Sequence, residues 1–64
     1  MCLSNVYKRQ ISDNNLLLNN VQRIECRNGT IVLTDIMERQ VSVEGEILLV
    51  DLIENKVIIA PKED

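Results

Sequence analysis

The residue of this chain best suited to chemistry is the cysteine directly behind the first methionine, in the opening Met1-Cys2-Leu3-Ser4. A thiolate is a soft ligand, and mixed nitrogen and sulfur donors in a square plane suit Ni(II) or Cu(II). Cys2 can offer its thiolate together with its own nitrogen, which is an amine if Met1 is removed and an amide if Met1 stays. The alternative is that Cys2 is a small apolar residue at the start of a strand, since free cysteines are often buried.

The second cysteine predicts a different role. Ile24 and Cys26 alternate with Arg23, Glu25 and Arg27, and this period of two places Cys26 on the buried face of a strand. We therefore expect Cys26 to be a core thiol and not a metal ligand. Two cysteines so far apart in the chain also lack the closely spaced ligand pairs that are typical of structural zinc sites.

The rest of the composition argues against an enzyme. The chain has no histidine, which removes the commonest general base and every catalytic arrangement that needs an imidazole. Two glycines cannot build a phosphate-binding loop. We interpret the acidic residues of the central region as solvated charge at strand ends and turns, rather than as catalytic carboxylates; they are Asp35, Glu38, Glu44, Glu46 and Asp51.

Length and charge limit the remaining classes. A chain of 64 residues makes one domain, residues 1–64, and its core is so small that oligomerisation or a metal is needed to support it. No apolar run approaches the roughly 20 residues of a membrane helix, and no secretory segment is evident, so we expect a cytoplasmic protein with reduced thiols. The net charge of −3 and the single aromatic residue, Tyr7, argue against nucleic-acid binding.

The pattern along the chain is that of short strands separated by turn residues. We expect strands over residues 2–8, 16–27, 30–36, 40–52 and 56–60. Asn28-Gly29 is the strongest local signal, because both central residues of a type I′ hairpin turn need positive φ. Glu44-Gly45 indicates a bulge or a sharp bend, and Asn19-Asn20 a second bend. The predicted fold is all-β: a small, partly open antiparallel barrel of about five strands, SH3-like or OB-like.

Two apolar runs break the alternation of buried and exposed residues. They are Leu16-Leu17-Leu18 and Ile47-Leu48-Leu49-Val50, and consecutive apolar residues of a strand point to opposite faces. One face fills the barrel, and a second subunit is the simplest cover for the other. We therefore expect a homodimer; the alternatives are a covering loop or a few exposed leucines.

The order of several segments resembles one known family. The opening Met1-Cys2-Leu3-Ser4-Asn5-Val6-Tyr7 resembles the start of the CooT-type small nickel-binding proteins, which are associated with nickel delivery to carbon monoxide dehydrogenase. The resemblance continues through residues 16–21, 23–25, 31–36, 43–47, 50–52 and 56–59. Each segment is short, but their order, the total length and the Met-Cys start together are fairly specific.

The resemblance implies an SH3-like barrel that forms homodimers and binds one Ni(II) through the N-terminal cysteine of each subunit, a role that falls on Cys2 here. The leading hypothesis is thus a dimeric Ni(II)-binding accessory protein, a metallochaperone for a nickel enzyme such as carbon monoxide dehydrogenase. The alternative is a small SH3-like protein-interaction module in which Cys2 is structural. An RNA-binding barrel, the function to which some members of the family have been assigned, is less consistent with the acidic charge.

Overall fold

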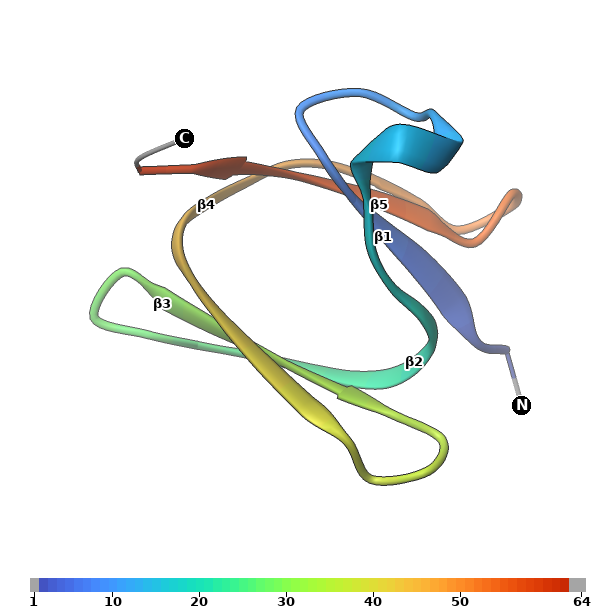
Figure 1. The fold of residues 1–64 in the computed structure, drawn as a ribbon, viewed down its shortest axis with the longest axis horizontal. Coiled ribbons are helices and arrows are strands. Elements are labelled where there is room, and N and C mark those ends of the chain that lie inside the picture. Colours follow the sequence, from blue (N-terminus) through green and yellow to red (C-terminus); the bar gives the residue numbers. More distant parts are fainter. Residues whose placement is uncertain (1, 63–64) are drawn as a thin grey trace.

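Five strands form one closed barrel in the computed structural model, which describes residues 2–62 (Figure 1). The strands are β1 (Ser4–Lys8), β2 (Leu16–Arg27), β3 (Thr30–Asp35), β4 (Gln40–Asp51) and β5 (Lys56–Pro61), with a short 3-10 helix, η1 (Asp13–Asn15), before β2. Successive strands pair antiparallel, and a parallel pairing of β1 with β5 completes the ring. The predicted all-β barrel of about five strands is confirmed.

The core of the barrel is aliphatic. Four of the five strands contribute one or two buried side chains to its centre, and the cluster consists of Val6, Val21, Ile31, Leu33, Val57 and Ile59. β-branched side chains dominate this set, as expected for residues that pack well on a pleated surface. Six buried residues are a small core, so the stability of the domain depends on each of them.

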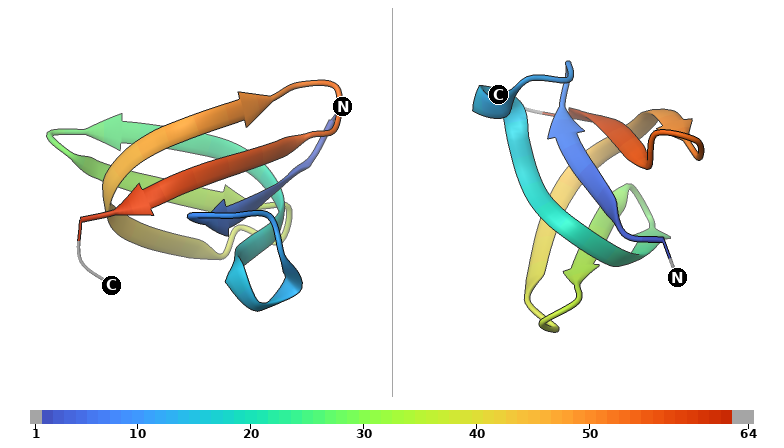
Figure 2. Two further views of the ribbon diagram at one scale, coloured as in Figure 1. Left: turned by 90° about the horizontal axis from the view of Figure 1, so that it is seen from above. Right: turned by 90° about the vertical axis from the view of Figure 1, so that its right-hand side faces the viewer.

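The two long strands, β2 and β4, bend so that each pairs with two neighbouring strands. Strand β4 pairs with β3 as far as Glu44 and with β5 from Gly45 onward, and Figure 2 shows it curving around the barrel. The close approach at this corner needs glycine, because a Cβ on Gly45 would lie 2.2 Å from the carbonyl oxygen of Ala60. The predicted bend is confirmed, and the irregularity in pairing lies further on, between Ile47 and Leu49.

The predicted turns are also present. Asn28 has a φ of 50° and Gly29 one of 84°, as the hairpin between β2 and β3 requires. Asn20 has a φ of 53°, and the pairing of β2 with β3 shifts between Val21 and Arg23. This irregularity changes which side chains of β2 face the interior along the rest of the strand.

The barrel has two ends of different character. Strand β1 begins at the end that also holds the β3–β4 turn and the β4–β5 hairpin, on the right of Figure 1. We call it the N-terminal end. The opposite end holds the β2–β3 turn and the corner at Gly45. In the part of the chain described, no helix is long and apolar enough to cross a membrane.

Candidate metal centre

Cys2 lies two residues before Ser4, the first residue of β1, and is exposed to solvent at the N-terminal end of the barrel. Cys2 is therefore not buried in the core of this chain, as it would be if it were a small apolar residue at the start of a strand. The prediction that Cys2 binds a metal ion is not tested by its exposure, but an exposed thiol is accessible to an ion from solvent.

Asn5 holds the start of β1 to its neighbours. Its backbone N–H donates to the carbonyl oxygen of Asn55 at 2.9 Å, and its side-chain Oδ1 accepts from the N–H of Asn20 at 3.4 Å. The carbonyl oxygen of Asn20 in turn accepts from the N–H of Ile36 at 2.9 Å. The residues just after Cys2 are thus connected to β2, to the β3–β4 turn and to the β4–β5 hairpin.

Asp35, which the sequence led us to interpret as a solvated carboxylate, is completely buried at the end of β3. Its Oδ1 accepts from the N–H groups of Met37 at 2.9 Å and Arg39 at 2.8 Å, and its Oδ2 accepts from Nε of Arg39 at 2.7 Å. Desolvation by burial raises its pKa, but the backbone and guanidinium hydrogen bonds from Arg39 and the N–H of Met37 outweigh it and hold the pKa below its ordinary value. Asp35 is therefore a structural residue that fixes the β3–β4 turn.

Asp51 repeats this arrangement at the end of β4. Its Oδ1 accepts from the N–H of Ile53 at 3.0 Å and from that of Glu54 at 2.9 Å. This side chain is only partly buried, yet it caps the backbone of the β4–β5 hairpin in the same way. Two turns of the N-terminal end are thus each ordered by the aspartate that precedes them.

The prediction for Cys26 is wrong in one respect. Cys26 pairs with Ile31, which is 2% exposed, and it lines a hollow with Ile31 and Ile47, so its side chain faces the interior as predicted. It is nevertheless exposed, because it lies two residues before the Asn28-Gly29 turn, where the hollow that it lines opens to solvent. Cys26 belongs to the end opposite Cys2.

The described chain does not complete a metal shell around Cys2. Among residues 2–62, no three histidine, cysteine, aspartate or glutamate side chains come together as a group that could hold an ion. Any tight site at Cys2 must therefore draw further donors from backbone nitrogen, from solvent or from another molecule.

Part of the two apolar runs, residues 16–18 and 47–50, packs against the core. Leu17, Leu18 and Ile47 pack against the core cluster, whereas the remaining members stay exposed: Leu16, Leu48, Leu49 and Val50. Leu16 and Leu49 lie in one row across four strands, because Leu16 pairs with Tyr7, Tyr7 with Ile58, and Ile58 with Leu49. We call these four exposed residues the aliphatic strip; Leu16 and Leu49 share its row, whereas Val50 pairs with the core residue Val57 and lies on the other face of β4.

Comparison with curated proteins finds no match. The model of one protein family, described as the CO dehydrogenase accessory protein CooT, matches residues 1–60. The match covers the N-terminal cysteine, all five strands through Ala60 and both aspartate-capped turns. The chain therefore belongs to the CooT family of CO dehydrogenase accessory proteins.

Proposed function

We propose that this protein is a homodimeric Ni(II)-binding accessory protein, a nickel chaperone and not itself an enzyme, in which Cys2 supplies the thiolate ligand. The family serves CO dehydrogenase, which is a nickel enzyme, so delivery of the metal is a role that fits such an accessory protein. The observation that carries the proposal is the exposed position of Cys2 at the N-terminal end, within the residues 1–60 that the family model matches.

A second subunit supplies the ligands that one chain lacks. A thiolate and a nitrogen from Cys2 fill half of a square plane, and a two-fold axis passing near Cys2 provides the same pair again. Two thiolates and two nitrogens form a donor set that suits Ni(II). One ion per dimer is the expected stoichiometry.

The aliphatic strip supports a dimer. Leu48, Leu49 and Val50 are 55%, 44% and 52% exposed, which is unusual for consecutive large apolar residues of a strand. Burial of such side chains between two copies supplements a core of six aliphatic residues. An isologous interface of this kind places identical residues of the two chains around one axis.

An exposed site also suits transfer. A chaperone must release its ion to a client, and an ion held by a few ligands at the surface can exchange them one at a time. The absence of a surrounding cluster of acidic or thiol side chains among residues 2–62 fits a carrier better than a permanent structural metal site.

Calorimetric titration of Cys2→Ser with Ni(II) tests the proposal. A serine hydroxyl is neutral near pH 7 and a poor ligand, so tight binding should be lost while the fold and the dimer persist. The wild-type complex should show a sulfur-to-nickel charge-transfer band in the near ultraviolet that the variant lacks. Cys26→Ser is the matched control and should bind Ni(II) like wild type. Unchanged affinity in Cys2→Ser would refute the role of Cys2.

A further inference from the structure

The turn between β2 and β3 carries a reactive pair of residues at the end of the barrel opposite Cys2. Asn28 is the one asparagine of this sequence that is followed by a glycine. An asparagine loses its side-chain amide when the backbone nitrogen of the next residue attacks its side-chain carbonyl carbon. A side chain on that next residue hinders the attack, so glycine is the most permissive neighbour. The structure around the turn then decides whether the reaction is open to this asparagine.

Both reacting groups of the turn are free of hydrogen bonds within residues 2–62. The side chain of Asn28 has no hydrogen-bond partner there, and the N–H of Gly29 donates to no acceptor. Gly29 takes part only through its carbonyl oxygen, which accepts from the N–H of Gly45 at 3.0 Å. A Cβ added to Gly29 would meet no atom within 4 Å, so no other part of the described chain packs against that side of the residue.

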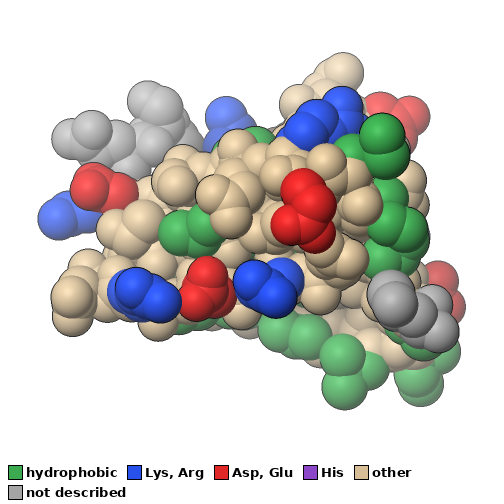
Figure 3. Space-filling view, turned by 90° about the horizontal axis from the view of Figure 1, so that it is seen from below, with side chains coloured by type: hydrophobic (Ala, Val, Ile, Leu, Met, Phe, Trp, Pro, Cys, Tyr) green, Lys and Arg blue, Asp and Glu red, His purple; other side chains and the backbone are tan. Residues whose placement is uncertain are grey.

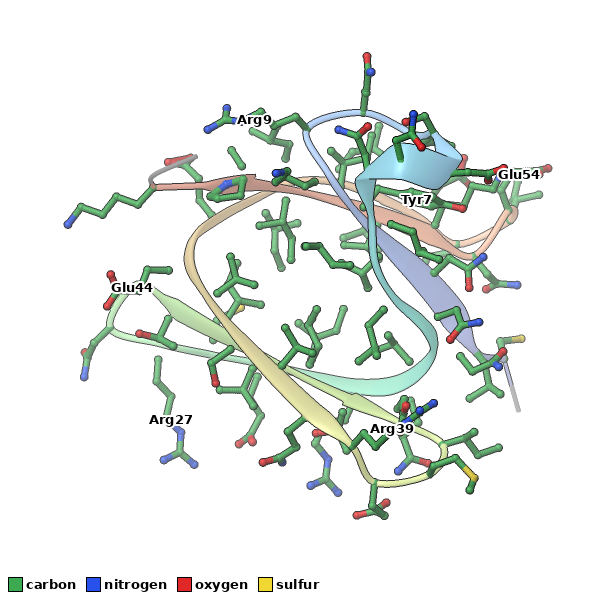
Figure 4. All side chains as sticks on the ribbon, viewed as in Figure 1. Tyr7, Arg9, Arg27, Arg39, Glu44 and Glu54 are labelled. Carbon is green, nitrogen blue, oxygen red and sulfur yellow. The ribbon has the colours of Figure 1, made fainter. Side chains whose placement is uncertain are left out.

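The flanking side chains leave the turn open to water. Asn28 and Gly29 are both exposed, and Arg27, just before them, donates from its guanidinium to Glu25 at 3.2 Å. Arg27 and Glu44 lie at this end of the molecule, on the left of Figure 4. Figure 3 shows charged and other polar groups over the same end, on the left, whereas hydrophobic side chains gather on the right. Water therefore reaches the turn without a large rearrangement.

The reaction needs a brief opening of the turn. Closure of a five-membered ring fixes the torsion about the bond between Cα and the carbonyl carbon of Asn28, and the residue must leave its present conformation, with a φ of 50°, to reach it. Exposed turns with few packing contacts open at the lowest cost in free energy. The tip of this hairpin meets that condition, because its side chains take no part in the core cluster.

We propose that Asn28 is a site of spontaneous deamidation, and that the isoaspartate formed there weakens the corner of the barrel at Gly45. The Gly29 nitrogen forms a bond to Cγ of Asn28, and the side-chain nitrogen leaves as ammonia with the proton of the Gly29 N–H. Water then opens the cyclic imide. Addition at Cγ gives aspartate, whereas addition at the backbone carbonyl carbon breaks its bond to the Gly29 nitrogen and gives isoaspartate. Nothing is oxidised or reduced, and water is the only co-reactant.

Isoaspartate changes the path of the backbone through this turn. The chain then runs through Cβ and Cγ of residue 28, which inserts one extra backbone atom before Gly29. The two-residue turn holds the carbonyl oxygen of Gly29 at 3.0 Å from the nitrogen of Gly45, so a longer turn displaces this acceptor. Because the hydrogen bond lies at the corner where β4 changes partners, its loss should lower the stability of the barrel.

Peptide mapping by mass spectrometry that separates isoaspartate from aspartate tests the site, after storage of the wild-type protein in mildly alkaline buffer with a thiol reductant. Both products should accumulate at residue 28, with release of ammonia. Asn55 is the internal control, because it has a φ of 57° in another hairpin but is followed by Lys56, and it should stay intact over the same period. An unmodified Asn28, or reaction at Asn55 as fast as at Asn28, would overturn the proposed site.

Urea unfolding tests the effect on the corner. The stored wild-type protein should unfold at a lower urea concentration than the fresh protein. Asn28→Gly should show no such change on storage, because glycine keeps the positive φ without strain and has no amide to lose. Asn28→Asp gains the charge without the extra backbone atom and should be more stable than the purified isoaspartate form. Equal stability of these two proteins would show that the lengthened turn does not weaken the corner, and the proposed consequence would be wrong.

Discussion

Replacement of Gly45 by alanine should destabilise the barrel more than the same replacement at Gly29, the other glycine of the chain. The new Cβ would lie 2.2 Å from the carbonyl oxygen of Ala60 and 2.8 Å from the Cα of Pro61. Both atoms belong to the backbone of β5, so no side-chain rotation relieves the overlap. Strands β4 and β5 must separate by about 1 Å to restore ordinary contact distances.

That separation acts on the hydrogen bonds around the corner. The N–H of Gly45 donates to the carbonyl oxygen of Gly29 at 3.0 Å, and the N–H of Lys62 donates to that of Glu44 at 2.6 Å. Each such bond contributes about 1 kcal/mol, and overpacking adds about 1–3 kcal/mol. The expected loss is about 2–5 kcal/mol, comparable with the roughly 3–5 kcal/mol that a core of this size provides.

Urea unfolding followed by far-ultraviolet circular dichroism, at one fixed protein concentration, measures this loss. The Gly45→Ala protein should show little cooperative change in its circular dichroism signal as urea is added. Gly29→Ala is the control: its Cβ meets nothing within 4 Å, but its φ of 84° should cost about 1–2 kcal/mol. Gly29→Asn should cost less, because asparagine tolerates this region. If Gly45→Ala is no less stable than Gly29→Ala, the explanation of the corner is wrong.

Three further predictions concern other parts of the molecule. The lowered pKa of Asp35 means that its contribution to stability is complete above about pH 5 and is lost as pH falls through the folded-state pKa. The urea concentration at the unfolding midpoint, measured from pH 3 to pH 7, should therefore decrease toward acid pH. The Asp35→Asn protein should be less stable near neutrality, and its stability should depend less on pH. Cys26→Ser should change the unfolding free energy by no more than about 0.5 kcal/mol, because the thiol is exposed, and a larger loss would place Cys26 in the core after all. Leu49→Ser should shift sedimenting species from dimer toward monomer with an unchanged circular dichroism spectrum, and an intact dimer would exclude Leu49 from the interface.

The strands and turns followed from local signals. Asn28-Gly29 fixes a hairpin through its backbone preferences alone, and runs of β-branched residues mark β3 and β5 without reference to distant parts of the chain. The aliphatic character of the core follows from composition instead, since the chain has no tryptophan or phenylalanine and Tyr7 is its single aromatic residue. The corner at Gly45 was foreseen because glycine in a strand indicates a close approach of backbone.

The errors arose where burial depends on distant parts of the chain. Cys26 faces inward, as its alternation predicts, but the alternation does not tell how far a residue lies from the open end of the barrel. Asp35 ends a strand like any surface acid, and only the donors gathered around it, from Met37 and Arg39, make its burial favourable. An aspartate at a strand end with an arginine four residues later was the available signal.

Native mass spectrometry of the purified protein with limiting Ni(II) tests the central claim most directly, since it reports subunit number, metal stoichiometry and the state of Met1 together. We expect a single dominant species of two chains and one nickel ion, with the Cys2→Ser protein remaining a metal-free dimer under the same conditions. A folded monomer that binds one ion by itself, or a Cys2→Ser dimer that keeps its nickel, would contradict a metal site shared through Cys2.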